Sequence, residues 1–223
     1  RGARCYVAAR EKLDIQKWMN SFSTNVKAAS GGIHGRPLQK DDMICFKEKN
    51  EYKCFLKEDD FKILHWKADI AWNEIQIERL AIIRGNEWDW LTDESKKKFL
   101  YEPFIIDSLA DRMGYRLQNK LESHKTGEIV STAVSFGTIQ LLPNGEMIIL
   151  MADHQTTGGY PRVAHIISTH LPLLAQKQPG ERIYFRLIDQ SKAEELLFKQ
   201  QHHLVQLQDA CKLKLEEFLN AHH

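Results

Sequence analysis

Residues 137–180 read GTIQLLPNGEMIILMADHQTTGGYPRVAHIISTHLPLLAQKQPG: an apolar segment, a turn, a second apolar segment and a polar glycine-rich loop. The turn Pro143-Asn144-Gly145-Glu146 predicts a tight hairpin, because Asn-Gly readily adopts the left-handed backbone that such a turn needs. Met147–Met151 is an uninterrupted apolar run, which is typical of a strand buried on both faces. We therefore expect a β-hairpin whose second strand leads into the polar loop.

The polar loop that follows is a candidate binding site. Two adjacent glycines allow backbone N–H groups to approach a ligand closely, and Pro161 is well placed to begin a helix. A loop before a helix N-terminus suits an anion or a carboxylate. The alternative is a structural turn whose hydroxyls cap the following helix, and no phosphate-loop spacing decides between the two. The candidate side chains and glycines are Asp153, Gln155, Thr156, Thr157, Gly158, Gly159 and Tyr160.

Composition limits the class of protein. With 43% hydrophobic and 27% charged residues, the 223-residue chain has the composition of a soluble globular protein. A net charge of +1 gives no general attraction to nucleic acid or to an anionic membrane. No apolar run approaches the roughly 20 residues that span a bilayer, and the first residues given lack the basic-then-apolar pattern of a secretion signal. The four cysteines are scattered, which fits a reducing cytoplasm. They also lack the paired spacing of a zinc site, so we expect no metal.

Arginines beside glycines provide further candidate anion contacts. Arg36 follows Gly35 in a turn, where it either binds an anion or is a solvated turn residue. Arg112 and Arg116 flank Met113-Gly114-Tyr115. This pair either binds a carboxylate or phosphate or forms ion pairs with Asp111 and neighbouring acids.

Short strands dominate the rest of the pattern. Thr92 is expected to cap a short charged helix, and Ser191 with Glu194 forms a capping box at the start of a long C-terminal helix. An apolar stripe on that helix packs on the protein's own core or docks a partner. The stripe comprises Leu204, Leu207, Cys211, Leu215 and Phe218, and the predicted strands are Arg4–Ala9, Ile75–Ile83, Phe104–Ser108, Glu128–Val134 and Arg182–Ile188.

Four motifs carry a resemblance to a known family. They are GGIHGRPL at 31–38, ADRMGYRL at 110–117, the string from Gly137 to Pro161, and LPLLAQKQPGERIYF at 171–185. In these motifs the chain resembles the family that holds the C subunit of bacterial 5-oxoprolinase, also called the allophanate hydrolase subunit 2 or biotin-dependent carboxyltransferase family. The resemblance covers most of residues 28–188, and the chain departs from the family pattern at residues 10–13 and 86–87.

The resemblance implies a mainly β fold of cyclophilin-like barrel units with a C-terminal amphipathic helix. Residues 1–85 would be the remainder of a first barrel, whose N-terminal part is expected to precede this chain. Residues 86–190 would form the second barrel, and residues 191–220 the C-terminal helix.

The function implied by the resemblance is ATP-dependent opening of 5-oxoproline to L-glutamate by a cytoplasmic assembly with partners resembling the A and B subunits of 5-oxoprolinase. ATP would be a co-substrate of the assembly. The chain alone would be inactive, because its own motifs supply neither a phosphate loop nor a complete nucleophile–base set. Asp153, Gln155, Thr156 and Tyr160 are the candidate catalytic residues. The candidate substrate-binding residues are Arg36, Arg112, Arg116, Thr157, Gly158 and Gly159.

Two alternatives follow from other branches of the same family. One is a non-enzymatic antagonist that binds an inhibitor of a sporulation histidine kinase. The other is a carboxyltransferase domain of a urea-carboxylase-like system. In that case carboxybiotin would arrive on another chain, because the sequence lacks a Met-Lys-Met biotin acceptor.

Overall fold

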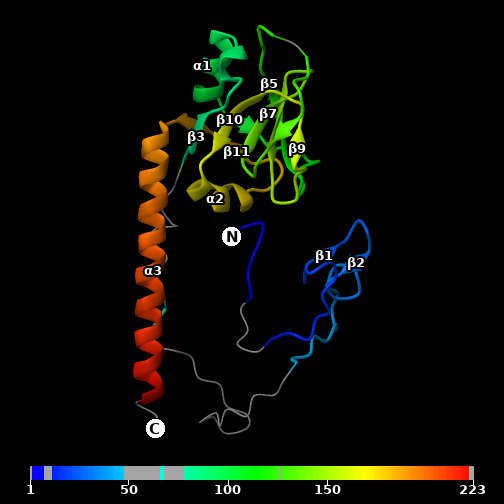
Figure 1. Cartoon of the computed structure of the whole chain (residues 1–223), viewed down its shortest axis with the longest axis vertical. Coiled ribbons are helices and arrows are strands. Elements are labelled where there is room, and N and C mark those ends of the chain that lie inside the picture. The colour runs from blue at the N-terminus through cyan, green and yellow to red at the C-terminus, as the bar shows by residue number, and fades with distance from the viewer. Residues whose placement is uncertain (1, 8–11, 48–65, 68–77, 126, 221–223) are drawn as a thin grey trace. The chain divides into compact units, whose positions relative to one another are not determined.

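The computed structural model describes residues 2–7, 12–47, 66–67, 78–125 and 127–220 (Figure 1). The chain forms two compact units, one made of Arg1–Cys5 with Trp66–His223 and the other of Tyr6–His65. The larger unit contains every predicted site residue except Arg36, which belongs to the smaller unit.

The smaller unit consists mostly of turns. Its two short strands, β1 (Thr24–Asn25) and β2 (Ser30–Gly31), pair antiparallel. Arg36 binds Asp42 through two hydrogen bonds of 2.8 and 2.7 Å, from Nη1 to Oδ2 and from Nη2 to Oδ1. These bonds lower the pKa of Asp42. Arg36 is therefore part of an ion pair within its own turn.

The larger unit is built on a six-stranded sheet with strand order β12-β3-β10-β7-β8-β5. The sheet is curled (Figure 1). Its neighbours pair antiparallel except for β12 and β3, which are parallel. The strands are β3 (Leu80–Arg84), β5 (Gly114–Lys120), β7 (Thr138–Leu141), β8 (Glu146–Leu150), β10 (Arg162–Ile166) and β12 (Phe185–Leu187). The prediction of a mainly β fold with a C-terminal helix is confirmed.

Two short ribbons accompany the sheet. In one, β4 (Phe104–Ile105) pairs with β11 (Arg182–Ile183), and in the other β6 (Thr132–Ala133) pairs with β9 (Thr157–Gly158). Arg182–Ile188, predicted as one strand, is thus divided between β11 in a ribbon and β12 in the sheet. Of the predicted strand Glu128–Val134, only Thr132 and Ala133 form a regular strand, β6.

The predicted hairpin is confirmed. Gly145 adopts a positive φ of 84°, and the Leu142 N–H donates to the Glu146 carbonyl at 2.8 Å. The following strand, β8, has one partly exposed apolar member, Ile148, whereas Met147, Ile149 and Leu150 are buried. The expectation of burial on both faces therefore fails at Ile148, which lies on the polar face of the sheet.

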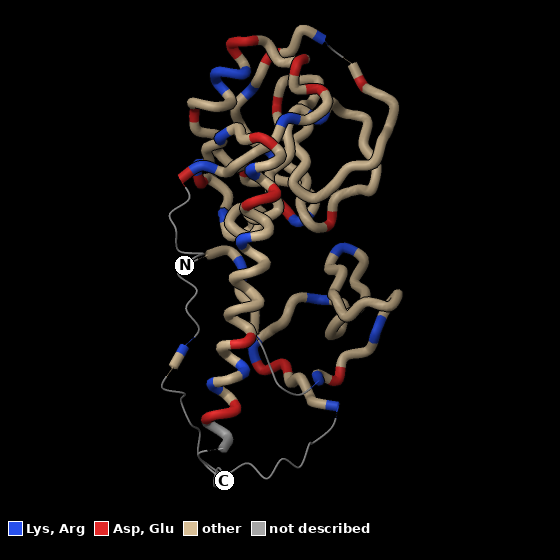
Figure 2. The backbone as a smooth tube through the Cα atoms, turned by 60° about the vertical axis from the view of Figure 1, so that its left-hand side comes forward, with Lys and Arg blue, Asp and Glu red and all other residues tan. Residues whose placement is uncertain are grey.

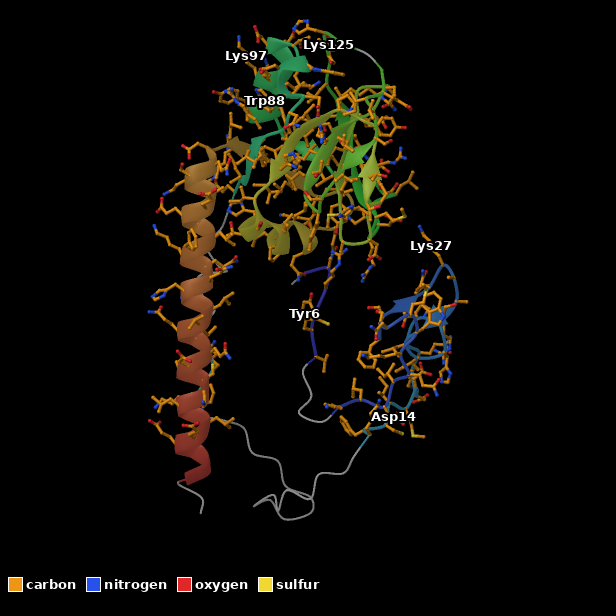
Figure 3. All side chains as sticks on the ribbon, in the orientation of Figure 1. Tyr6, Asp14, Lys27, Trp88, Lys97 and Lys125 are labelled. Carbon is orange, nitrogen blue, oxygen red and sulfur yellow. The ribbon has the colours of Figure 1, made fainter. Side chains whose placement is uncertain are left out.

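An aromatic cluster closes the core on the other face. The ring centroids of Phe99 and Phe185 are 4.8 Å apart, and those of Phe99 and Phe104 are 5.6 Å apart. Phe99 belongs to α1 (Asp93–Tyr101), whose N-terminus is capped by Thr92 as predicted. Figure 3 labels Lys97 and Trp88 at and beside α1. Trp88, which starts the 3-10 helix η2 (Trp88–Trp90), is 4% exposed and packs beside Phe99.

Three further helical segments follow: η3 (Ser168–His170), α2 (Leu171–Ala175) and α3 (Gln190–Asn220). The cap of α3 is Asp189, whose Oδ1 accepts from the Lys192 N–H at 2.7 Å, so the predicted Ser191 capping box is wrong. The helix carries acidic and basic residues along its length (Figure 2). No described helix combines the length and hydropathy needed to cross a bilayer.

The division into residues 1–85, 86–190 and 191–220 stays a prediction. Within the larger unit, β3 precedes the predicted boundary at residue 85 and yet pairs with both β10 and β12. Its first three residues are 4%, 0% and 0% exposed, so β3 is an inner strand of this sheet.

Candidate functional site

Pro161 does not begin a helix, so this prediction is wrong. It leads into β10, which lies between β3 and β7, and Val163 and Ala164 of that strand are fully buried. Proline fits at the entry of a strand, where its missing N–H breaks no ladder bond, and the Pro161 carbonyl accepts from the Leu141 N–H at 2.9 Å. Burial on both sides therefore favours strand over helix, and no helix N-terminus follows the polar loop directly.

Part of the polar loop is paired as a β-ribbon. Thr157 and Gly158 lie opposite Ala133 and Thr132, and the Gly159 carbonyl accepts from the Ile129 N–H at 2.7 Å. Neither Gly158 nor Gly159 has a positive φ. Gly158 instead approaches a side chain closely, because a Cβ there would lie 2.6 Å from Gln140 Nε2 and would displace the end of that side chain.

The ribbon lies beside a pocket of about 340 Å³ at the polar face of the sheet. Its position follows from strand register, since Arg116 lies opposite Ile148 and Ile148 opposite Gln140. Residues opposite one another in antiparallel strands direct their side chains to the same face. The pocket is lined by Arg116, Gln140, Leu142, Pro143, Asn144, Ile148, Gln155 and Tyr160.

The lining of the pocket includes an exposed cation, Arg116, and a buried amide, Gln140. Arg116 is exposed, whereas Gln140 is 1% exposed and donates from Nε2 to the Tyr160 carbonyl at 3.4 Å. Because only the amide nitrogen can donate to a carbonyl, this bond fixes the orientation of the amide and leaves Oε1 as an acceptor. Sequence reasoning missed Gln140, although it is the single polar residue in the run Ile139–Leu142.

Arg112 and Asp153 bind each other. Nε and Nη2 of Arg112 donate to Oδ2 and Oδ1 of Asp153 at 2.6 and 2.9 Å. These hydrogen bonds, opposed by burial and supported by the arginine charge, lower the pKa of Asp153. A carboxylate with a lowered pKa is a weaker base. The catalytic role of Asp153 and the substrate-binding role of Arg112 therefore stay predictions.

A buried ion pair lies next to the pocket and was also missed. Arg162 pairs in register with Gln140, and its Nε and Nη2 each donate to Glu87 at 3.1 Å. Burial raises the pKa of Glu87, but hydrogen bonds from the Arg162 side chain and backbone outweigh it, and the net shift is downward. Both side chains are at most 15% exposed. Glu87 therefore anchors the start of β10 beside the pocket.

His165 extends this polar cluster. Its Nδ1 lies 3.1 Å from the hydroxyl of Thr138, which is fully buried. Burial, followed by the charge of Arg162, lowers the pKa of His165. The imidazole is thereby favoured in its neutral form.

The structure thus brings together a subset of the predicted site. Arg116, Gln155 and Tyr160 line one pocket, whereas Thr157 and Gly158 form the ribbon beside it. Thr156 is exposed, and its carbonyl accepts from the Val134 N–H at 3.1 Å. The roles assigned to these residues stay predictions, and Arg36 lies in the other unit.

Comparison with known proteins gives a family match over most of the chain. The family model described as carboxyltransferase domain, subdomain A and B, matches residues 1–187. The 5-oxoprolinase C subunit of Haemophilus influenzae is 32% identical over 203 residues, covering 91% of this chain and 62% of the relative. The 5-oxoprolinase C subunit of Escherichia coli is 32% identical over 207 residues, covering 92% of this chain and 63% of the relative. The chain therefore spans less than two thirds of these relatives.

Solved structures support the fold. The urea amidolyase of Kluyveromyces lactis matches with a TM-score of 0.68 at 20% identity, over 89% of this chain and 13% of that one. The protein TTHA0988 matches with a TM-score of 0.53 at 25% identity, over 78% of this chain and 32% of that one.

Proposed function

Because the chain belongs to the family of carboxyltransferase domains, subdomains A and B, we propose that it acts in a 5-oxoprolinase assembly that opens 5-oxoproline to L-glutamate with ATP hydrolysis. The proposal includes partners resembling the A and B subunits of 5-oxoprolinase and a cytoplasmic location. It is supported by the two relatives that are named as 5-oxoprolinase C subunits.

The observation that carries the proposal is the polarity of the pocket containing Arg116 and Gln140. The substrate, 5-oxoproline, is a small cyclic amide with one carboxylate and one ring N–H. An arginine suits the carboxylate, and the free acceptor of Gln140 suits the N–H. The apolar wall of Ile148 and Leu142 suits the ring methylenes, and about 340 Å³ is ample for such a ligand.

The chain is proposed to supply binding and orientation rather than the whole reaction. Opening the lactam requires activation of an unreactive amide carbonyl. In the proposed course the carbonyl oxygen attacks the terminal phosphorus of ATP and ADP leaves. Water then adds to the carbon, the C–N bond breaks and phosphate departs. The base that deprotonates the water is assigned to a partner, since the Asp153 carboxylate is held by Arg112.

Reconstitution of the complex tests this function. Co-expression with the two partner subunits should give 5-oxoproline-dependent release of phosphate and glutamate, and the chain alone should give neither. Arg116→Gln should raise KM for 5-oxoproline about tenfold or more, because one charge-assisted hydrogen bond is lost. Gln118→Ala, at an exposed position on the same strand, is the matched control. An unchanged KM in Arg116→Gln would refute the assigned substrate pocket.

A carboxyltransferase is the second candidate, favoured by the family description and the structural match to urea amidolyase. In that case a carboxylated biotin carrier on another chain would be the donor. Loss of the carboxyl group from carboxybiotin, dependent on this chain and on an amide acceptor, would favour this candidate over lactam opening.

A further inference from the structure

A second pocket, of about 450 Å³, is lined by basic side chains from three separate segments. Arg79 lies immediately before β3, Lys177 follows α2, and Arg182 begins β11. Glu78 is the one acid among the described residues of its lining. We call this site the basic pocket, and its described lining has no residue in common with the pocket that contains Arg116.

Among the described residues, the basic side chains of this pocket have no ion-pair partner. Within residues 78–125 and 127–220, no ion pair within 4 Å involves Arg79, Lys177 or Arg182. By contrast, Arg112 and Arg162 in the same unit each bind a carboxylate. Among the described lining residues, three cations and one acid surround this concavity, which gives it a net positive charge.

Arg79 is held in a defined orientation. Its Nη1 donates to the Leu100 carbonyl in the last turn of α1 at 2.9 Å, and its guanidinium lies over the Tyr184 ring, 6.0 Å from the centroid. One edge of the guanidinium is therefore fixed, and its other donors are not used in these two contacts. A cation fixed before binding loses less conformational entropy when an anion arrives.

We propose that the basic pocket binds the phosphate groups of a small phosphorylated ligand. A single carboxylate is satisfied by one arginine, whereas a chain of phosphates presents several acceptor oxygens to donors from different directions. Lys177 supplies a compact point charge and Arg182 a planar fork, and both suit phosphate. The proposal stands independently of the function assigned to the Arg116 pocket.

Direct titration of the purified chain tests this proposal. Sodium tripolyphosphate, added to the chain at low ionic strength in a calorimeter, should bind and should bind more weakly as salt is added. Lys177→Gln and Arg182→Gln should each weaken binding about tenfold or more, since each removes a charge-assisted contact. Arg79 is left unchanged because it also holds the end of α1.

Arg186→Gln is the matched control, because Arg186 is an exposed arginine on β12 outside the pocket lining. It should bind tripolyphosphate like the unaltered chain, and circular dichroism should show all three variants folded. If ATP competes with tripolyphosphate, the natural ligand is a nucleotide. If ATP does not compete, the natural ligand is a phosphorylated compound without a nucleoside. No heat of binding, or equal weakening in Arg186→Gln and the two pocket variants, would overturn the proposal.

Discussion

Stability of the larger unit is expected to fall in mild acid because of His170. This side chain is 4% exposed, and its Nδ1 accepts a hydrogen bond of 2.8 Å from the Ala81 N–H. Burial, followed by the charge of Arg186, lowers the pKa of His170 to about 4. In the unfolded chain the pKa is the ordinary value near 6.5.

The sign of the effect follows from proton binding. Between pH 6.5 and 4 the unfolded chain binds a proton at His170 that the folded chain does not, so acid favours unfolding. Because of this difference in proton binding, the free energy of unfolding falls by about 2 kcal/mol at pH 5 and about 3 kcal/mol at pH 4, relative to pH 7.5. Above pH 6.5 the contribution is fully present.

The assay is urea unfolding followed by circular dichroism at pH 5, 6 and 7.5. His170→Asn keeps an acceptor for the Ala81 N–H but does not titrate. Between pH 7.5 and pH 5, its free energy of unfolding should therefore fall by about 2 kcal/mol less than that of the unaltered chain. His124→Asn, at an exposed histidine, is the matched control and should retain the pH dependence of the unaltered chain. Equal pH dependence of the unaltered chain and His170→Asn would refute the reasoning.

Three further predictions concern local contacts. Glu87→Ala should lower the free energy of unfolding by about 3 kcal/mol, because it leaves the buried charge of Arg162 unpaired; a loss below about 1 kcal/mol in urea titration would contradict this. Gly158→Ala should push the Gln140 amide aside and weaken 5-oxoproline binding by the assembled complex without a large change in melting temperature. Calorimetry on the assembled variant checks it, and undiminished affinity would count against the assigned pocket. Thr92→Ala should cost about 1 kcal/mol through loss of the α1 cap, measurable as a lower urea midpoint.

Local turn chemistry explains which parts of the fold could be predicted from sequence. The hairpin at Asn144-Gly145 and the Thr92 cap each depend on a few consecutive residues, and both are present. Pro161 shows the limit, because its fixed φ and missing N–H fit a helix start and a strand entry equally well. What decides between them is burial of β10 between β3 and β7, and β3 lies about eighty residues away in sequence.

The same nonlocal pairing explains why the candidate site was predicted only in part. Arg116, Gln155 and Tyr160 stand out as polar residues in distinctive motifs, and they meet in one pocket. Gln140 becomes significant only through register, which places it opposite Ile148 and beneath Gly158. A polar side chain in an apolar strand is costly to bury without a partner. Such a residue therefore indicates a candidate site in a sequence as well as a glycine-rich loop does.

The ribbon formed by β6 and β9 connects these observations. Backbone pairing with β6 holds Thr157 and Gly158 in place, so strand partners order this part of the polar loop. The fixed backbone in turn brings the Tyr160 carbonyl within reach of Gln140 Nε2. The Gln140 amide beside the pocket is therefore oriented by the protein's own contacts. Under the proposed function, this orientation would lower the entropic cost of a hydrogen bond between the amide and the substrate.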